Sequence, residues 1–222
     1  MSVKTYFEQT ADNFDALYED RCNLSYRFNR LFRKALFQRI EKTLETFEDL
    51  EDFSVLDVGC GSGRNCALFV ECGARRVVGV DFSAPMLELA REYTRQKRVA
   101  DQCEFIQADF LEHPFGETFD MVVALGVFDY VADPARVLKR MSDLANQKVV
   151  ASFPGMSPLR APLRKLRYAL RGCPVHFYTR AKLKRICHDA GLKGFRIERL
   201  ASSGYMLVGA TRAAHNRAIA NA

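Results

Sequence analysis

The sequence predicts one α/β domain with a doubly wound, mostly parallel sheet, an antiparallel C-terminal hairpin and helices ahead of its first strand. Three observations predict this fold class. The length of 222 residues suits a single domain with a large buried core. From residue 53 onward, short apolar runs alternate with stretches of helical periodicity, as in parallel sheets covered on both faces. The last two apolar runs are joined only by Ser202-Ser203-Gly204, a connection short enough for a hairpin.

Residues 1–50 are predicted to form two amphipathic helices. The first has Tyr6, Phe14 and Tyr18 on one face, as in an amphipathic helix packed on the sheet. Apolar and aromatic residues, together with one threonine, recur at helical spacing in both segments. They are Tyr6, Phe7, Thr10, Phe14, Leu17 and Tyr18, and then Leu31, Leu36, Ile40, Leu44 and Phe47.

Residues 53–153 carry the strand and helix alternation of the core. Ser83 and Asp133 stand before two of the helices, each with a proline close behind, so both are predicted N-caps. The predicted strands are Phe53–Val58, Val77–Val80, Cys103–Gln107, Met121–Ala124 and Val149–Phe153. The predicted helices are Arg64–Glu71, Ala84–Lys97 and Pro134–Asn146.

Residues 154–178 interrupt the alternation and are predicted to be an insertion after the fifth strand. They contain four of the seven prolines and one short Leu/Arg-rich stretch. Residues 179–212 then return to the pattern. A helix from Thr179 to about Ala190 is followed by two strands, Gly194–Leu200 and Tyr205–Thr211.

The positive charge of the chain is concentrated in one segment. Gly155–His188 contains nine Lys and Arg residues and no acid, whereas the whole chain has a net charge of +6. The remainder is therefore acidic, with a net charge of −3. The segment has three interpretations: a solvated face, a site for an anionic substrate or an anionic membrane surface, or a nucleic-acid surface. No recognisable RNA-binding module supports the last.

Several other classes are excluded by composition. The longest apolar run, Met121–Phe128, is too short to span a bilayer, and the N-terminus has charges where a signal peptide needs an apolar stretch. The seven cysteines include no C-x-x-C pair, which argues against a disulfide framework or a zinc site. These features predict a cytoplasmic protein without a metal, which docks at a membrane surface at most.

Val55–Asn65 forms the most informative motif, a buried strand that enters a glycine-rich turn and then a helix. Glycines allow a sharp turn and the close approach of a ligand, and the helix start offers unpaired N–H groups. Gly59, Gly61 and Gly63 read G-x-G-x-G, whereas the dinucleotide fingerprint requires G-x-G-x-x-G and would place its third glycine at Arg64. Taken alone, the turn could simply join strand to helix.

Acidic residues end the next two strands. Asp81 can accept hydrogen bonds from both hydroxyls of a ribose, or it can cap the following helix. Asp109 can accept a hydrogen bond from an adenine amino group, with Phe110 against the ring. The carboxyl ends of parallel strands meet at one edge of a sheet, where such sheets bind ligands.

These motifs together resemble those of the class I methyltransferases that use S-adenosylmethionine (SAM), which have a Rossmann-like fold. The similarity covers about residues 53–153 and rests on four runs in the family's order: Val55–Gly63, Val77–Leu87, Ala108–Phe110 and Phe119–Gly126. It implies that SAM is the cofactor. It also implies that the N-terminal helix with Tyr6, Phe14 and Tyr18 covers SAM as a lid, the alternative being that the helix only packs on the sheet. By the same resemblance the residues that bind SAM are Asp57, Gly59, Gly61, Gly63, Asp81, Phe82, Met86, Asp109, Phe110, Leu125 and Gly126.

Candidate catalytic residues are Asp129, Tyr130 and His176. Asp129 and Tyr130 follow the fourth strand, where relatives often have a Glu-His pair, so a histidine base is missing at that place. His176 lies beside Tyr178, where the insertion returns to the domain. Each of these side chains either acts on the acceptor or only forms the wall of the site.

The predicted function is methyl transfer from SAM to a small-molecule acceptor, by alignment and exclusion of water with or without a base. O-methylation of an acidic or lipid-like metabolite is favoured over N- or C-methylation. The alternatives are a SAM-binding scaffold without activity and a nucleic-acid methyltransferase. Arg64 argues against a dehydrogenase.

Overall fold

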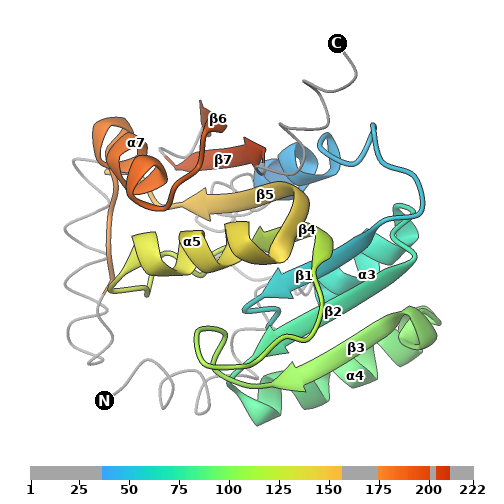
Figure 1. The fold of residues 1–222 in the computed structure, drawn as a ribbon. Coiled ribbons are helices and arrows are strands. Elements are labelled where there is room, and N and C mark those ends of the chain that lie inside the picture. The colour runs from blue at the N-terminus through green and yellow to red at the C-terminus, as the bar shows by residue number, and fades with distance from the viewer. Residues whose placement is uncertain (1–36, 157–174, 201–203, 211–222) are drawn as a thin grey trace, which may run out of the picture.

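The computed structural model describes residues 37–156, 175–200 and 204–210 (Figure 1). The predicted first helix, with Tyr6, Phe14 and Tyr18, and most of the basic insertion lie outside the described residues. The second predicted helix is confirmed in its described part, because residues 37–44 are helical.

Seven strands form one sheet in the order β3-β2-β1-β4-β5-β7-β6. The first five in this order pair in parallel, whereas β7 is antiparallel to both β5 and β6. The predicted fold class and its terminal hairpin are therefore confirmed. The strands are β1 (Ser54–Val58), β2 (Arg76–Asp81), β3 (Cys103–Gln107), β4 (Phe119–Ala124), β5 (Ala145–Phe153), β6 (Gly194–Arg199) and β7 (Tyr205–Ala210).

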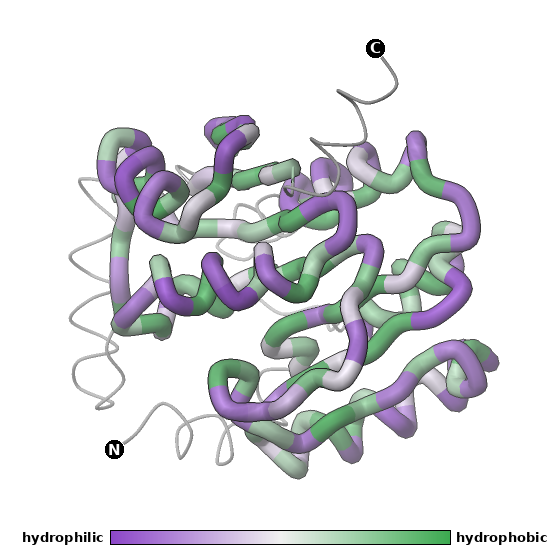
Figure 2. Tube along the Cα trace, viewed as in Figure 1, coloured by the Kyte–Doolittle hydropathy of each residue, from purple (hydrophilic) through white to green (hydrophobic). Residues whose placement is uncertain are grey.

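Helices cover both faces of the sheet, as Figure 1 shows. They are α3 (Arg64–Glu71), α4 (Ala84–Lys97), α5 (Pro134–Leu144) and α7 (Arg180–Asp189). The side chains of a strand alternate between faces, so Leu56 and Val58 of β1 join the core beneath α5 and α7 while Val55 joins the core beneath α3 and α4. In Figure 2 the central strands are accordingly mostly hydrophobic, and α4 and α7 alternate between the two colours.

The predicted caps form, with one difference. Asp133 accepts a hydrogen bond from the Arg136 N–H at 3.1 Å, and Thr179 accepts one from the Lys182 N–H at 3.2 Å. Ser83 occupies the N-cap position of α4, but its hydroxyl makes no cap bond. Asp81 instead accepts a hydrogen bond from the Ser83 N–H at 2.9 Å. The start of α4 is thereby attached to the end of β2.

The prediction of a helix up to Asn146 was wrong at its C-terminal end. α5 stops at Leu144, and β5 begins at Ala145, which pairs with Phe119 of β4. The polar residues Asn146, Gln147 and Lys148 concealed the start of this strand, because a buried parallel strand is expected to be apolar. Gln147 is satisfied by a hydrogen bond to Asp120 at 3.2 Å, which no local pattern reveals.

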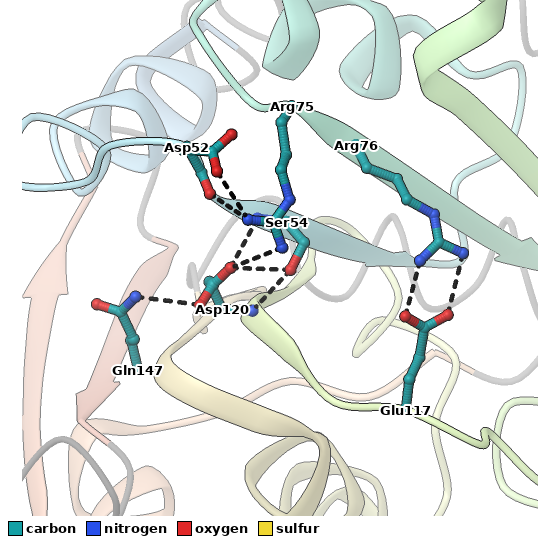
Figure 3. Close-up of polar contacts among 7 residues, drawn as sticks. All are labelled: Asp52, Ser54, Arg75, Arg76, Glu117, Asp120 and Gln147. Atoms are coloured by element: carbon teal, nitrogen blue, oxygen red, sulfur yellow. Dashed lines mark hydrogen bonds and ion pairs between the residues drawn. The ribbon is translucent and has the colours of Figure 1, made fainter.

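A polar network ties the amino ends of the central strands together (Figure 3). Asp120 at the start of β4 accepts hydrogen bonds from Ser54 of β1 and from Gln147 of β5. Arg76 of β2 forms ion pairs of 2.7 Å with Glu104 and Glu117. The carboxyl ends of the same strands lie at the opposite edge of the sheet and take no part in this network.

Within the described ranges, no helix has both the length and the apolar character needed to cross a membrane.

Candidate active site

The turn between β1 and α3 depends on three glycines with left-handed backbone conformations. The φ angles of Gly59, Gly61 and Gly63 are 68°, 54° and 70°, values that other residues adopt only with strain. The N–H groups of Gly59 and Cys60 donate to the Val80 carbonyl at 2.8 and 3.2 Å, which fixes the turn against the end of β2.

The three glycines serve different purposes. A Cβ atom at Gly59 would lie 2.6 Å from Cγ2 of Val127, and one at Gly63 would lie 2.8 Å from Cβ of Ala90. Both positions therefore require glycine for packing as well as for backbone conformation. A Cβ atom at Gly61 would have no heavy atom within 4 Å. Gly61 therefore faces open space, where a ligand can approach the backbone.

Asp81 connects the turn to the start of α4. Its Oδ2 atom accepts a hydrogen bond from the Gly61 N–H at 3.0 Å, and its Oδ1 atom accepts the one from Ser83. Burial raises the pKa of this carboxyl group, while hydrogen bonds from the N–H groups of Ser83, Gly61 and Phe82 oppose the rise. Each carboxylate oxygen has more than one acceptor position, so the side chain can also accept hydrogen bonds from ligand hydroxyls.

Asp57 lies in the core beneath the turn, on the α3 side of β1. Its side chain is 1% exposed, and its Oδ2 atom accepts a hydrogen bond of 3.4 Å from the Cys66 thiol. Burial raises the pKa of Asp57 to about 7, and the charge of Asp81 adds to the rise. The hydrogen bond to Cys66 joins β1 to α3.

The residues after β2 and β3 differ in exposure. Asp109 is exposed, and its Oδ1 atom accepts a hydrogen bond from the Leu111 N–H at 2.8 Å. Phe110 is buried in the core beneath α5, with its ring centroid 5.9 Å from that of Phe115. Met86 is buried in the first turn of α4, and Phe82 is half-buried. Adenine contacts by these residues stay a prediction.

The end of β4 passes close to an arginine that sequence reasoning missed. Gly126 has a φ of 87° and donates its N–H to Ser152 Oγ at 2.9 Å. A Cβ atom at Gly126 would lie 3.7 Å from the guanidinium of Arg39, in the helix before β1. The Arg39 Nε is buried, and the described residues give it no hydrogen-bond partner. No sequence signal marks Arg39, because it is one of many charged residues in an amphipathic helix.

The three candidate catalytic residues belong to two segments that are joined by a backbone hydrogen bond, the loop after β4 and residues 175–178. The His176 N–H donates to the Asp129 carbonyl at 2.8 Å, which attaches residues 175–178 to the loop after β4. Asp129 is 5% exposed, and Tyr130 and His176 are half-buried. The Tyr178 hydroxyl donates to the Phe128 carbonyl at 3.1 Å. Burial, together with the charge of Asp129, raises the pKa of Tyr178 to about 12.

The candidate groups thus follow the carboxyl ends of neighbouring strands: the glycine turn after β1, Asp81 at the end of β2, Asp109 after β3, and Gly126 and Asp129 after β4. They offer an open glycine backbone at the start of a helix, together with carboxylates. Such a set suits a ligand with hydroxyls, a carboxylate and a cationic centre better than it suits a phosphate chain.

Comparisons with known proteins agree with this geometry. Residues 55–148 match the model of a family described as a methyltransferase domain. The ubiquinone biosynthesis O-methyltransferase of Neisseria meningitidis serogroup C is 30% identical over 155 residues, which are 65% of this chain and 65% of that protein. The sterol 24-C-methyltransferase of Debaryomyces hansenii is 31% identical over 117 residues, 49% of this chain and 30% of that protein. The chain thus spans less than two thirds of the length of these relatives.

A solved structure has the same fold over almost the whole chain. The magnesium protoporphyrin IX methyltransferase of Synechocystis PCC 6803, with bound SAH, superposes with a TM-score of 0.76. The superposition covers 94% of this chain and 98% of that chain at 20% identity.

Proposed function

We propose that this chain, which belongs to the class I SAM-dependent methyltransferases, transfers the methyl group of SAM to an oxygen atom of a small, acidic or lipid-like acceptor. The observation that carries the proposal is the junction of Gly61 and Asp81. An open glycine backbone and a half-buried carboxylate meet there through a 3.0 Å hydrogen bond.

The residues present fit SAM without a lysine or a metal. The open backbone at Gly61 would lie against the methionyl part, and Asp81 would accept hydrogen bonds from the ribose hydroxyls. Met86 and Asp109 would contact the adenine, and Leu125 and Gly126 would lie near the sulfur. Arg39 extends this set. Its guanidinium lies beside Gly126, with a buried Nε atom, and would pair with the methionyl carboxylate.

When bound, SAM supplies an electrophilic methyl group on a positively charged sulfur. The protein then has to hold the acceptor oxygen in line with that methyl group and exclude water. In this proposal the acceptor binds beside the loop after β4, residues 127–131, and this region is the acceptor side of the site. The Asp129 carboxyl is buried there. A hydroxyl acceptor also loses a proton, so a base is needed at this place. We assign that role to the group formed by Asp129, Tyr130 and His176.

The acceptor class is supported by two observations. One relative is named for ubiquinone biosynthesis and another for methylation of sterols, which are apolar molecules. The chain itself concentrates nine cations in Gly155–His188, next to the acceptor side in sequence. Both features favour an acceptor that is apolar, acidic or both.

Isothermal titration calorimetry with SAM and SAH tests the cofactor step. Wild-type protein should bind both, and Asp81→Asn, which keeps the shape of the side chain, should bind at least about tenfold more weakly. Asp101→Asn serves as the matched control, since Asp101 is exposed on the 3-10 helix Ala100–Gln102. Equal binding by wild type and Asp81→Asn would contradict the assignment of the site.

The transfer step is tested with extracts of lipid-soluble and of water-soluble metabolites as sources of acceptor. We expect SAH formation with the lipid extract, and expect it to stop in Asp81→Asn. SAM binding without SAH formation in either extract would favour the scaffold alternative.

A further inference from the structure

The cations of α7 differ from most of those on the rest of the described surface. Arg180, Lys184 and Arg185 are exposed and form no ion pair with any described acid, and Lys182 lies with its Nζ atom 5.0 Å over the ring of Tyr178. Most other surface cations in the described ranges are paired with acids. Examples are Arg75, Arg76, Arg95, Lys97, Arg136 and Lys139.

The positions of these cations do not favour the helix itself. The N-terminal turn of a helix carries a partial positive charge, so cations there are destabilising and acids stabilising. α7 has no acid in its first turn and four cations in its first six residues. Leu183, Ile186 and Cys187 already bury the inner face of the helix in the core. Neither the stability of the helix nor its packing therefore explains the cations on its outer face.

The location of α7 connects this face to the acceptor side. The helix follows residues 175–178, which hydrogen-bond to the carbonyls of Phe128 and Asp129 after β4. Gly155 and Tyr178 pair in a parallel bridge, which brings Met156 near the start of α7. The Met156 side chain is 60% exposed, one of two large apolar side chains so exposed in the described ranges. Figure 1 shows α7 at the end of the sheet toward which β1 and β5 point.

We propose that the outer face of α7, formed by Arg180, Lys184 and Arg185 with Met156 beside it, docks on an anionic phospholipid surface. Cations bind the headgroups, and an exposed apolar side chain enters the interface. Such docking presents the acceptor side to a lipid-soluble substrate; in this respect it rests on the proposed function. A nucleic acid offers the same negative charge but no apolar phase for Met156.

Co-sedimentation of the full chain with vesicles tests the docking. Wild type should bind vesicles of phosphatidylcholine with phosphatidylglycerol, bind phosphatidylcholine alone at least about tenfold more weakly, and be released by salt. The variant Lys184→Gln/Arg185→Gln should lose about tenfold or more in affinity for the anionic vesicles. The matched control, Arg95→Gln/Lys97→Gln, removes the same charge from α4 on the opposite face and should bind like wild type.

Three outcomes overturn the docking: equal binding to both vesicle types, equal loss in the α4 control, or binding to a mixed-sequence oligonucleotide that outcompetes the anionic vesicles. The variant Met156→Ser adds a readout that charge alone would not move, because it removes the exposed apolar side chain and should also weaken vesicle binding. SAM affinity is measured on every variant. Wild type that binds SAM but no vesicles contradicts only the docking, whereas wild type that binds no SAM contradicts the proposed function whatever the vesicles show.

Discussion

The Oδ2 atom of Asp120 accepts hydrogen bonds from both the backbone N–H and the hydroxyl of Ser54, each 2.9 Å long (Figure 3). Ser54 begins β1 and Asp120 lies near the start of β4, so one carboxylate joins two central strands at the edge opposite the site. Its other oxygen accepts a hydrogen bond from Gln147 of β5. The register of three parallel strands, and with it the alignment of their carboxyl ends, is reinforced by this one side chain.

Asp120→Asn should destabilise the protein by about 1–2 kcal/mol at neutral pH, because it replaces a charged acceptor in a half-buried network. Burial alone would raise the pKa of Asp120, but hydrogen bonds from Ser54 and Gln147 and the charge of Arg75 hold it below the ordinary 3.8. The folded state therefore favours the carboxylate, and its contribution is present above pH 3.8 and lost as the pH falls through the lower folded-state pKa.

Urea unfolding at several pH values measures this effect. The difference between wild type and Asp120→Asn should be largest near pH 7 and shrink below pH 3.8. Asp143→Asn, which removes an exposed ion pair with Lys139, should cost less than about 0.5 kcal/mol. A difference for Asp120→Asn that does not change with pH would contradict this role of its charge.

Gly63→Ala and Gly61→Ala should separate stability from cofactor binding. The alanine at 63 combines a φ of 70° with a Cβ 2.8 Å from Ala90, so it should cost about 2 kcal/mol or more of unfolding free energy. The alanine at 61 meets no atom and should cost about 1 kcal/mol, for its φ of 54° alone. SAM affinity should nevertheless fall in Gly61→Ala, as calorimetry can measure. A Gly61→Ala variant with full SAM affinity would show that the ligand does not approach there.

Arg39→Met should weaken SAM binding about tenfold or more without destabilising the fold. It removes a buried Nε atom that has no hydrogen-bond partner in the described residues. The unfolding free energy should therefore stay the same or rise. 5′-Methylthioadenosine, which lacks the amino-acid part of SAM, provides the internal control. Its affinity should not change. Equal losses for both ligands would mean that Arg39 acts through the fold and not through the carboxylate.

Tyr178→Phe should slow methyl transfer while leaving SAM affinity unchanged. The hydroxyl holds the Phe128 carbonyl at 3.1 Å, beside Asp129, and its loss should free the loop after β4 at a cost of about 1 kcal/mol. Amide hydrogen exchange should become faster at residues 127–131 and stay the same at residues 59–63. Unchanged amide exchange in both segments would show that Tyr178 does not position the loop after β4.

Asp57→Asn should change how stability depends on pH. Burial raises the Asp57 pKa from 3.8 to about 7, so the folded state holds a proton that the unfolded state releases. The stability of the wild type due to this group is present below pH 3.8 and is lost as the pH rises through about 7. The variant should therefore gain stability relative to wild type between pH 4 and pH 7 in thermal unfolding. A constant difference would show that Asp57 is not protonated in the folded state.

The sequence by itself determined the sheet, its helices and the cofactor motif, because each depends on local patterns. Apolar runs predicted six of the seven strands to within a few residues, and the G-x-G-x-G spacing with Asp81 indicated the cofactor edge. The same patterns misplaced the start of β5, because Gln147 there donates a hydrogen bond to Asp120 of another strand. Only the tertiary structure brought Arg39 to Gly126, and His176 to Asp129. Such contacts join residues far apart in the chain, and the burial that gives these side chains their properties exists only after the sheet has formed.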